Sequence, residues 1–140
     1  MDGPALYPTM AYRDPRAAIE WLERAFGFER MVVHPEEGPV MHAELAVGTG
    51  VLMVTTLDEK SASQPNRGYN APYVYVADPD AHHARATAAG AEVTRPLENT
   101  FYGSREYSVR DLEGNEWSFG TYRPLPTQAR QPSGGTSVSR

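Results

Sequence analysis

Two segments of this chain repeat one pattern at a fixed spacing. Asp14-Pro15 and Asp78-Pro79 lie 78 − 14 = 64 residues apart. In both pairs aspartate suits the residue that caps a helix N-terminus, and proline suits the first helical position. Helical spacing of apolar residues follows each pair, and each helix is expected to stop at a glycine, Gly27 or Gly90. The repeat therefore predicts two cognate helices.

Extended segments surround both helices. A short segment of strand character precedes each helix, at residues 7–12 and 71–76, again 64 apart. Three more follow each helix: "FERMVVH", "MHAELAV" and "GVLMVTT" in the first copy, then "AEVTRP", "REYSVRD" and "NEWSFGT" in the second. The order βαβββ therefore occurs twice. Because 64 residues is too long a period for the usual solenoids, the copies are expected to pair about a pseudo-twofold axis. We predict an α+β fold in which curved mixed sheets form a cleft and the helices lie outside.

The chain length fits one such domain. With 140 residues and 40% hydrophobic residues, we expect a single domain over residues 1–123. Module one covers about 5–57, a polar linker covers 58–70, and module two covers 71–123. Residues 124–140 contain almost no apolar side chains and are expected to form a disordered tail.

Charge and composition narrow the partners. The formal net charge of −5 disfavours nucleic acid and anionic membrane surfaces. The sequence has no apolar run long enough to span a bilayer and no signal segment, so the expected location is cytoplasmic. The absence of cysteine excludes disulfides, thiolate nucleophiles and cysteine-based zinc sites.

Three phrases carry a family resemblance: "AAIEWLERAFGFE" (17–29), "HAELAVG" (42–48) and "YGSREYSVRDLEGNEWSF" (102–119). Together with the paired βαβββ modules, they make the chain similar to the vicinal oxygen chelate superfamily of glyoxalases, bleomycin-resistance proteins and extradiol dioxygenases. The phrases look most like its bleomycin- or thiocoraline-resistance-like members. The resemblance covers about residues 5–123. It implies a small-molecule cleft and, from the family's habit of building clefts across two chains, a homodimer.

The resemblance also implies where metal ligands would stand. Metal-dependent members place imidazole, amide or carboxylate groups on the first and last strand of each module, which here correspond to Tyr7, Val54, Ala71 and Ser118. None of these is a usual ligand for a divalent metal. We therefore expect no metal and no cofactor. If the alignment slips, Glu116 is the nearest replacement carboxylate.

Strand alternation from those positions predicts the residues that line the cleft. We expect ligand-binding residues at Tyr7, His42, Glu44, Val54, Tyr73, Tyr75, Tyr102, Arg105, Glu106, Glu116 and Ser118. The two tyrosines of "YVY" either stack on a planar ligand or pack on each other or on a partner chain. Arg105 points either into the cleft mouth or outward to a surface salt bridge, because Gly103 can flip the local alternation.

His42 and Glu106 occupy matching places, since 106 − 42 = 64, so the pseudo-twofold axis predicts a hydrogen bond between them across the cleft. The pair is interpreted first as structural. Otherwise His42 is a candidate general base or, with Glu44, part of an improvised metal site. The other histidines, including His82, are expected to be exposed, and Trp117 and Phe119 are expected to face the helices as core.

These observations lead to two function hypotheses. The first is a protein that binds and sequesters a small molecule, such as an antibiotic or another aromatic natural product, without the family's metal ligands. The second is an enzyme, either a metal-dependent lyase, isomerase or dioxygenase or a metal-free enzyme that uses His42 as general base.

Overall fold

The computed structural model describes residues 3–4, 6–58 and 71–124. Apart from Asp58 and Pro124, the predicted linker and tail lie outside these residues. Neither helix in the described part of the chain has the length and apolarity needed to cross a membrane.

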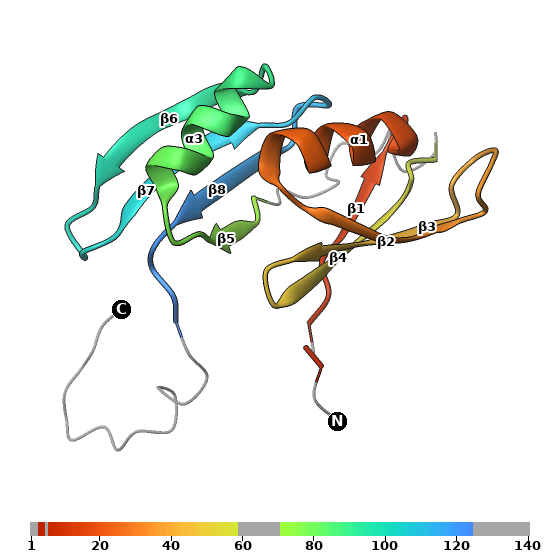
Figure 1. The fold of residues 1–140 in the computed structure, drawn as a ribbon, viewed down its shortest axis with the longest axis horizontal. Coiled ribbons are helices and arrows are strands. Elements are labelled where there is room, and N and C mark those ends of the chain that lie inside the picture. Colours follow the sequence, from red (N-terminus) through yellow and green to blue (C-terminus); the bar gives the residue numbers. More distant parts are fainter. Residues whose placement is uncertain (1–2, 5, 59–70, 125–140) are drawn as a thin grey trace.

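The first module contains β1 (Thr9–Tyr12), α1 (Pro15–Phe26), β2 (Glu29–His34), β3 (His42–Val47) and β4 (Gly50–Thr56). The second contains β5 (Tyr73–Tyr75), α3 (Pro79–Ala88), β6 (Glu92–Asn99), β7 (Arg105–Arg110) and β8 (Glu116–Gly120). Each module forms one four-stranded mixed sheet, with the orders β1-β4-β3-β2 and β5-β8-β7-β6 (Figure 1). In each sheet the first strand runs parallel to the last and the other neighbours are antiparallel. The predicted α+β architecture of two βαβββ modules is confirmed.

The aspartate caps explain where the helices begin. The Asp14 side chain accepts a hydrogen bond from the Ala17 backbone N–H at 3.2 Å, and the Asp78 side chain accepts one from Ala81 at 3.1 Å. The first helix ends at Gly27, whose φ of 79° lies in the left-handed region that glycine adopts without strain.

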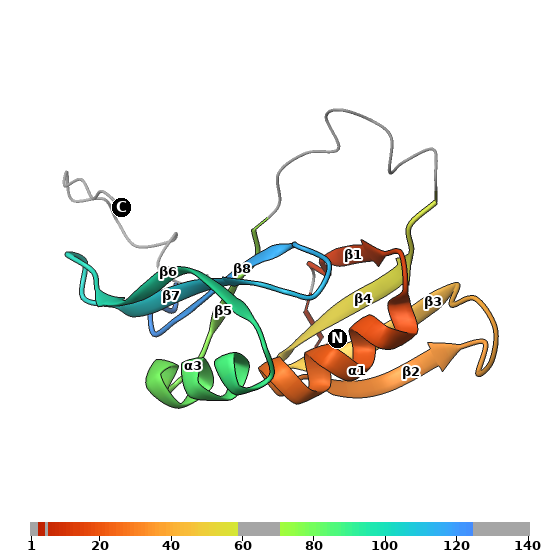
Figure 2. The same ribbon diagram turned by 90° about the horizontal axis from the view of Figure 1, so that it is seen from above.

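One face of each sheet is covered by a helix, and both helices lie on the same side of the molecule (Figure 2). The helix α1 presents a continuous buried stripe, whereas α3 buries only Pro79 and Ala86. Among the described residues, no helix lies on the opposite face of either sheet. These two uncovered surfaces, here called the open faces, are where a binding site can form.

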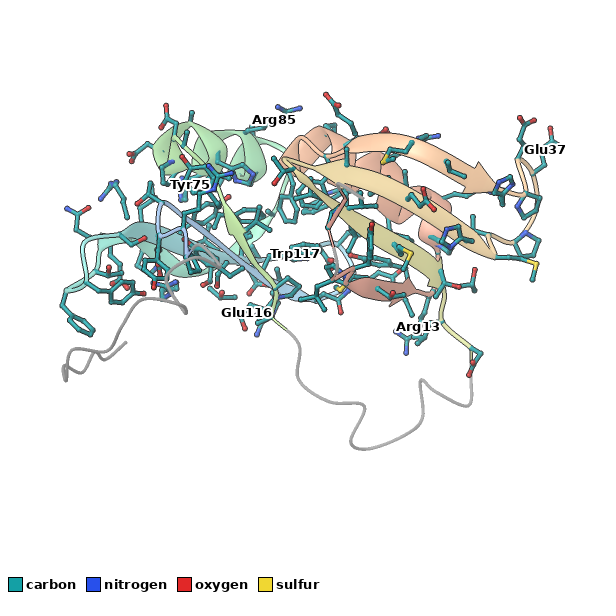
Figure 3. All side chains as sticks on the ribbon, turned by 90° about the horizontal axis from the view of Figure 1, so that it is seen from below. Arg13, Glu37, Tyr75, Arg85, Glu116 and Trp117 are labelled. Carbon is teal, nitrogen blue, oxygen red and sulfur yellow. The ribbon has the colours of Figure 1, made fainter. Side chains whose placement is uncertain are left out.

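The core is continuous across the module boundary. The Phe26 ring of α1 packs edge-on against Trp117 and Phe119 of β8, with centroids 5.5 and 4.9 Å apart. Trp117 is 1% exposed and lies between the modules (Figure 3), so the predicted core role of Trp117 and Phe119 is confirmed. Arg85 of α3 joins the helices by donating to the carbonyl oxygens of Arg24 and Glu23 at the end of α1.

His82 also packs at the boundary between the two modules. Its ring centroid lies 4.1 Å from that of Phe119, and its Nε2 lies 3.1 Å from the carbonyl oxygen of Phe26. The prediction that His82 is an exposed residue is therefore wrong. It failed because the second helix packs against the first module as well as against its own sheet.

Candidate functional site

Strand alternation determines which residues lie on the open face of the second sheet. Tyr73 pairs with Ser118, Ser118 with Ser108, and Glu106 with Gly120, so these residues share the face opposite the buried Phe119. Tyr75 and Glu116 lie on this face as well, as the sequence predicted. The Glu116 side chain accepts a hydrogen bond from Thr94.

This face carries a cavity of about 450 Å³. We call it the tyrosine cavity and define it by its lining residues, Tyr73, Arg95, Phe101, Tyr102, Glu106, Ser118 and Tyr122. Its size lies in the range of small-molecule sites, and it combines aromatic walls with a few polar groups, which is typical of such sites.

The aromatic walls are held in place by their own contacts. The Tyr73 hydroxyl donates to the backbone oxygen of Tyr122 at 2.6 Å. The Tyr102 ring lies edge-on to Tyr122, at 5.9 Å, and to Phe101, at 5.0 Å. Phe101 is 99% exposed, and a phenyl ring left in water at a cavity rim is available for contact with a ligand.

The polar groups of the cavity centre on Glu106, whose side chain is only 6% exposed. Its Oε1 accepts hydrogen bonds from Arg95 Nη2 at 3.1 Å and from the Tyr102 hydroxyl at 2.9 Å. The bond to Glu106 raises the pKa of Tyr102, because the carboxylate favours the protonated phenol. Arg95 Nε donates to Ser108, whose Oγ lies 2.7 Å from Ser118 Oγ. One network therefore links Ser118 to Glu106 through Arg95.

Gly120 makes this arrangement possible. A Cβ at Gly120 would lie 2.5 Å from Glu106 Cγ and 3.0 Å from the Tyr73 hydroxyl. The absence of a side chain there leaves room for both residues at the cavity, which is the close approach that a glycine permits inside a strand.

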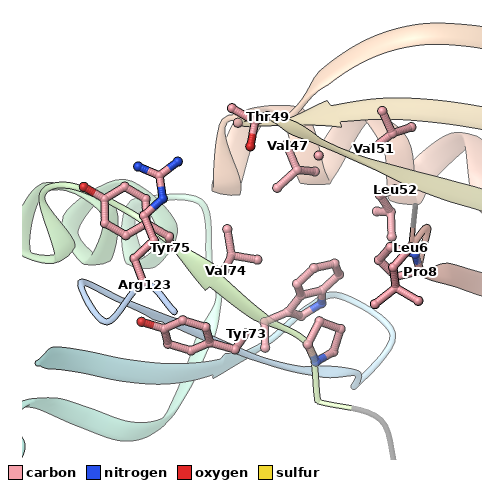
Figure 4. A pocket seen from close by; sticks show the side chains of 14 residues that line it. Leu6, Pro8, Val47, Thr49, Val51, Leu52, Tyr73, Val74, Tyr75 and Arg123 are labelled. Carbon is pink, nitrogen blue, oxygen red and sulfur yellow. The ribbon is translucent and has the colours of Figure 1, made fainter. Parts of the chain in front are cut away.

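A second hollow, the junction groove, lies between the modules and has a volume of about 260 Å³ (Figure 4). The Arg123 guanidinium lies 4.3 Å from the centroid of the Tyr75 ring, a cation–π distance. Tyr73 lines both hollows, whereas Tyr75 lines only the groove. Both tyrosines of β5 therefore line the junction groove, and of the two only Tyr73 also reaches the tyrosine cavity.

The open face of the first sheet holds the other predicted polar residues. His42 Nε2 lies 2.8 Å from Glu44 Oε2, and both side chains are partly exposed. The predicted hydrogen bond between His42 and Glu106 is wrong within one chain, because each residue pairs inside its own sheet. Tyr7 precedes β1 and is 40% exposed.

Val54 lies on the covered face, not on the open face as predicted. It pairs with Met10 and Ala43 and is 0% exposed, and its neighbour on the open face is Met53. Leu52, two residues before Val54 on the same strand, is 2% exposed and lies on the same covered face.

Arg105 points away from the tyrosine cavity. Its Nε and Nη2 donate to the two carboxylate oxygens of Asp80, both at 2.9 Å, at the start of α3. The inward orientation that made Arg105 a binding residue is therefore wrong, and the outward salt bridge is confirmed.

Arg95 and Phe101 were not predicted from the sequence. The β6–β7 pairing shifts register twice, between Val93 and Arg95 and between Arg95 and Glu98, so simple alternation does not give the face of Arg95. Phe101 lies in the loop before β7, where no periodicity applies. The one available signal was the aromatic pair "FY" beside Gly103.

The positions that hold metal in the related proteins do not fit a metal here. The strand pairing makes Met53, not Val54, the counterpart of Ser118, and the first-strand positions remain Tyr7 and Ala71. A thioether, a phenol, a methyl group and a hydroxyl are poor ligands for a divalent cation. Within residues 3–4, 6–58 and 71–124, no three histidine, aspartate or glutamate side chains converge as a metal site would require.

The sequence profile of the Glyoxalase/Bleomycin resistance protein/Dioxygenase superfamily matches residues 6–119. The chain belongs to this superfamily. The crystal structure of TioX from Micromonospora sp. ML1 superimposes with a TM-score of 0.72 and 36% identity, covering 87% of this chain and 98% of TioX. The uncharacterized protein Rv0887c of Mycobacterium tuberculosis is 31% identical over 125 residues, which is 84% of this chain and 74% of that protein.

Other superfamily members share the fold at lower identity. Lactoylglutathione lyase from Agrobacterium tumefaciens gives a TM-score of 0.61 at 19% identity, covering 84% of this chain and 94% of the lyase. At that identity the superfamily fold is shared, but the fold alone does not transfer the activity.

Proposed function

We propose that this protein binds a small, planar and partly apolar molecule reversibly in the tyrosine cavity. The observation that carries the proposal is the cavity itself, in which aromatic rings surround a buried carboxylate and a serine hydroxyl. Apolar walls supply affinity, and a few convergent polar groups orient the ligand. The superfamily includes bleomycin-resistance proteins, so an antibiotic or another aromatic natural product is the ligand class that we propose.

Binding alone is sufficient for such a role. A protein that is at least as abundant as its ligand lowers the free ligand concentration by mass action, without any chemical step. We propose this sequestration in the cytoplasm, by a homodimer, in keeping with the family's habit of building clefts across two chains.

A metal-free enzyme is the second candidate, and the His42–Glu44 contact favours it. A carboxylate 2.8 Å from Nε2 can orient the imidazole and leave Nδ1 to accept a proton. The metal-dependent alternative has no such support, because the residues at the ligand positions do not fit a metal.

The test of the binding proposal starts with a thermal-shift screen of quinoline, quinone and glycopeptide compounds, followed by calorimetric titration. Tyr102→Ala removes a cavity wall and should weaken the best ligand about tenfold or more, because burial and ring contacts are lost together. Tyr75→Ala is the matched control. It removes a partly exposed tyrosine of the same sheet that lines only the junction groove, so affinity should stay within about twofold. The reverse pattern would place the site in the groove.

The same samples decide between the two candidates. Mass spectrometry should recover the ligand unchanged after prolonged incubation with the wild-type protein. Conversion of the ligand that His42→Asn abolishes would instead establish the general-base enzyme.

A further inference from the structure

One acceptor of the tyrosine cavity is unused. Both hydrogen bonds to Glu106 end on Oε1, and in the described part of the chain none ends on Oε2. No buried side-chain oxygen or nitrogen among the described residues lacks a hydrogen-bond partner, so an unpartnered Oε2 must reach solvent. Since Glu106 lines the cavity, that oxygen is open to a ligand.

The charges around the cavity leave this acceptor negative. Arg95 is the one cation among the lining residues that the structure describes, and it is shared between two carboxylates, Glu106 at 3.1 Å and Glu98 at 2.8 Å. One positive and two negative side chains give this cluster a net charge of −1. A second negative charge from a ligand would be repelled, while a donor carrying positive charge would form a charge-assisted hydrogen bond.

The position of the carboxylate is fixed before any ligand arrives. Arg95 and Tyr102 hold Oε1, and Gly120 provides the space beneath Cγ. A preorganised acceptor discriminates between ligands more sharply than a mobile one, because little ordering is needed on binding.

We infer that the tyrosine cavity selects planar aromatic molecules that carry a cationic N–H donor, which binds Glu106 Oε2, and that it rejects aromatic anions. This inference rests on the proposed function and specifies its ligand class.

Three probes of similar ring size separate the contributions of the aromatic ring, the charge and the N–H donor to binding. Protonated 4-aminoquinoline offers an aromatic ring, positive charge and N–H donors; N-methylquinolinium offers ring and charge without a donor; quinoline-4-carboxylate offers ring and negative charge. By calorimetric titration at pH 7 and low salt, 4-aminoquinoline should bind roughly tenfold more tightly than N-methylquinolinium, the difference expected for a hydrogen bond to a charged acceptor. Quinoline-4-carboxylate should bind most weakly of the three.

Glu106→Gln keeps the side-chain shape and removes the charge, so it should reduce the preference for 4-aminoquinoline over the carboxylate by about tenfold or more. Glu92→Gln is the matched control, because Glu92 also pairs with an arginine of this sheet, Arg110, but does not line the cavity. That control should leave the order and affinities of the probes unchanged. If Glu106→Gln does not fold, the order of the three probes on the wild-type protein still decides.

Two outcomes overturn the inference in different ways. Equal binding of the three probes, or an equal effect of both glutamine variants, contradicts the role of Glu106 while the cavity remains a binding site. Binding of none of the three, together with no binding compound in the thermal-shift screen, would remove the proposed function and this inference with it.

Discussion

The Tyr12 hydroxyl of β1 donates a 2.7 Å hydrogen bond to Asp111, a buried aspartate 99 residues further along the chain. The same Asp111 oxygen accepts from the indole Nε1 of Trp117 at 3.0 Å, so one carboxylate joins the first module to the second. Next to it, Glu113 accepts from the backbone N–H groups of Arg13 and Asp14, just before α1.

Replacing Asp111 should therefore weaken the contact between the two modules and destabilise the fold. Asp111→Ala leaves two buried donors without an acceptor, and the free energy of unfolding should fall by roughly 2 to 5 kcal/mol. Tyr12→Phe removes one donor and its expected cost is about 1 to 2 kcal/mol. Urea unfolding curves measure both. A loss below about 1 kcal/mol for Asp111→Ala would show that the junction does not depend on this carboxylate.

His82 should make the stability depend on pH. A carbonyl oxygen only accepts, so the contact with Phe26 requires hydrogen on Nε2, and Nδ1 then accepts from the Tyr107 hydroxyl at 2.7 Å. Burial, the main cause, lowers the pKa of His82 below its ordinary value of 6.5, so the folded protein holds the ring neutral. The unfolded chain takes up the proton first as pH falls below about 6.5.

The direction of the stability change with pH follows from that difference in proton uptake. Above about pH 6.5 this effect is absent, and below it the free energy of unfolding should fall by at most about 1.4 kcal/mol per pH unit until His82 titrates in the folded protein. Urea midpoints at pH 7.5 and 5.5 should show a smaller drop in His82→Gln than in the wild type. His34→Gln, which alters an exposed histidine, should keep the wild-type drop. Identical pH dependence in all three proteins would contradict a neutral, buried His82.

The protein should carry no stoichiometric, tightly bound divalent metal, because Tyr7, Met53, Ala71 and Ser118 stand at the ligand positions. Elemental analysis of protein purified without chelators should find well below one equivalent per chain. Close to one equivalent of zinc, nickel, iron or manganese, lost in His42→Ala but kept in His34→Ala, would mean that an unrelated set of ligands holds a metal.

Removal of residues 125–140 should leave the melting temperature within about a degree or two, since this segment offers little apolar area to bury. Differential scanning calorimetry of the shortened chain is the measurement. A larger decrease would show that the segment packs against the domain or a partner chain.

Local signals in the sequence were sufficient for much of the fold. The two Asp-Pro pairs predicted both helix starts, and the spacing of 64 residues correctly related β1 to β5 and β3 to β7. The spacing of 64 failed at the last strand of each module. Thr9 pairs with Met53 and Tyr73 with Ser118, so Met53 and Ser118 are equivalent, and 118 − 53 = 65.

The physical cause is one additional residue in a hairpin. Val47 pairs with Gly50 around a loop of two residues, 48–49, whereas its counterpart Asp111 bonds to Asn115 around three, 112–114. A shift of one residue moves every side chain of a strand to the opposite face, so Val54 was predicted on the wrong side. The site was harder to predict because Arg95 follows a bulge and Arg105 is held by a helix residue 25 positions away.

The most direct test of the binding site is a two-dimensional NMR titration of ¹⁵N-labelled protein with the tightest compound from the thermal-shift screen. If the tyrosine cavity is the site, the largest amide shifts should occur at Tyr102, Glu106 and Ser118, with the same dissociation constant at each. If the largest shifts were confined to His42, Glu44 and their neighbours on the first sheet, with the second sheet unchanged, ligand binding in the tyrosine cavity would be contradicted.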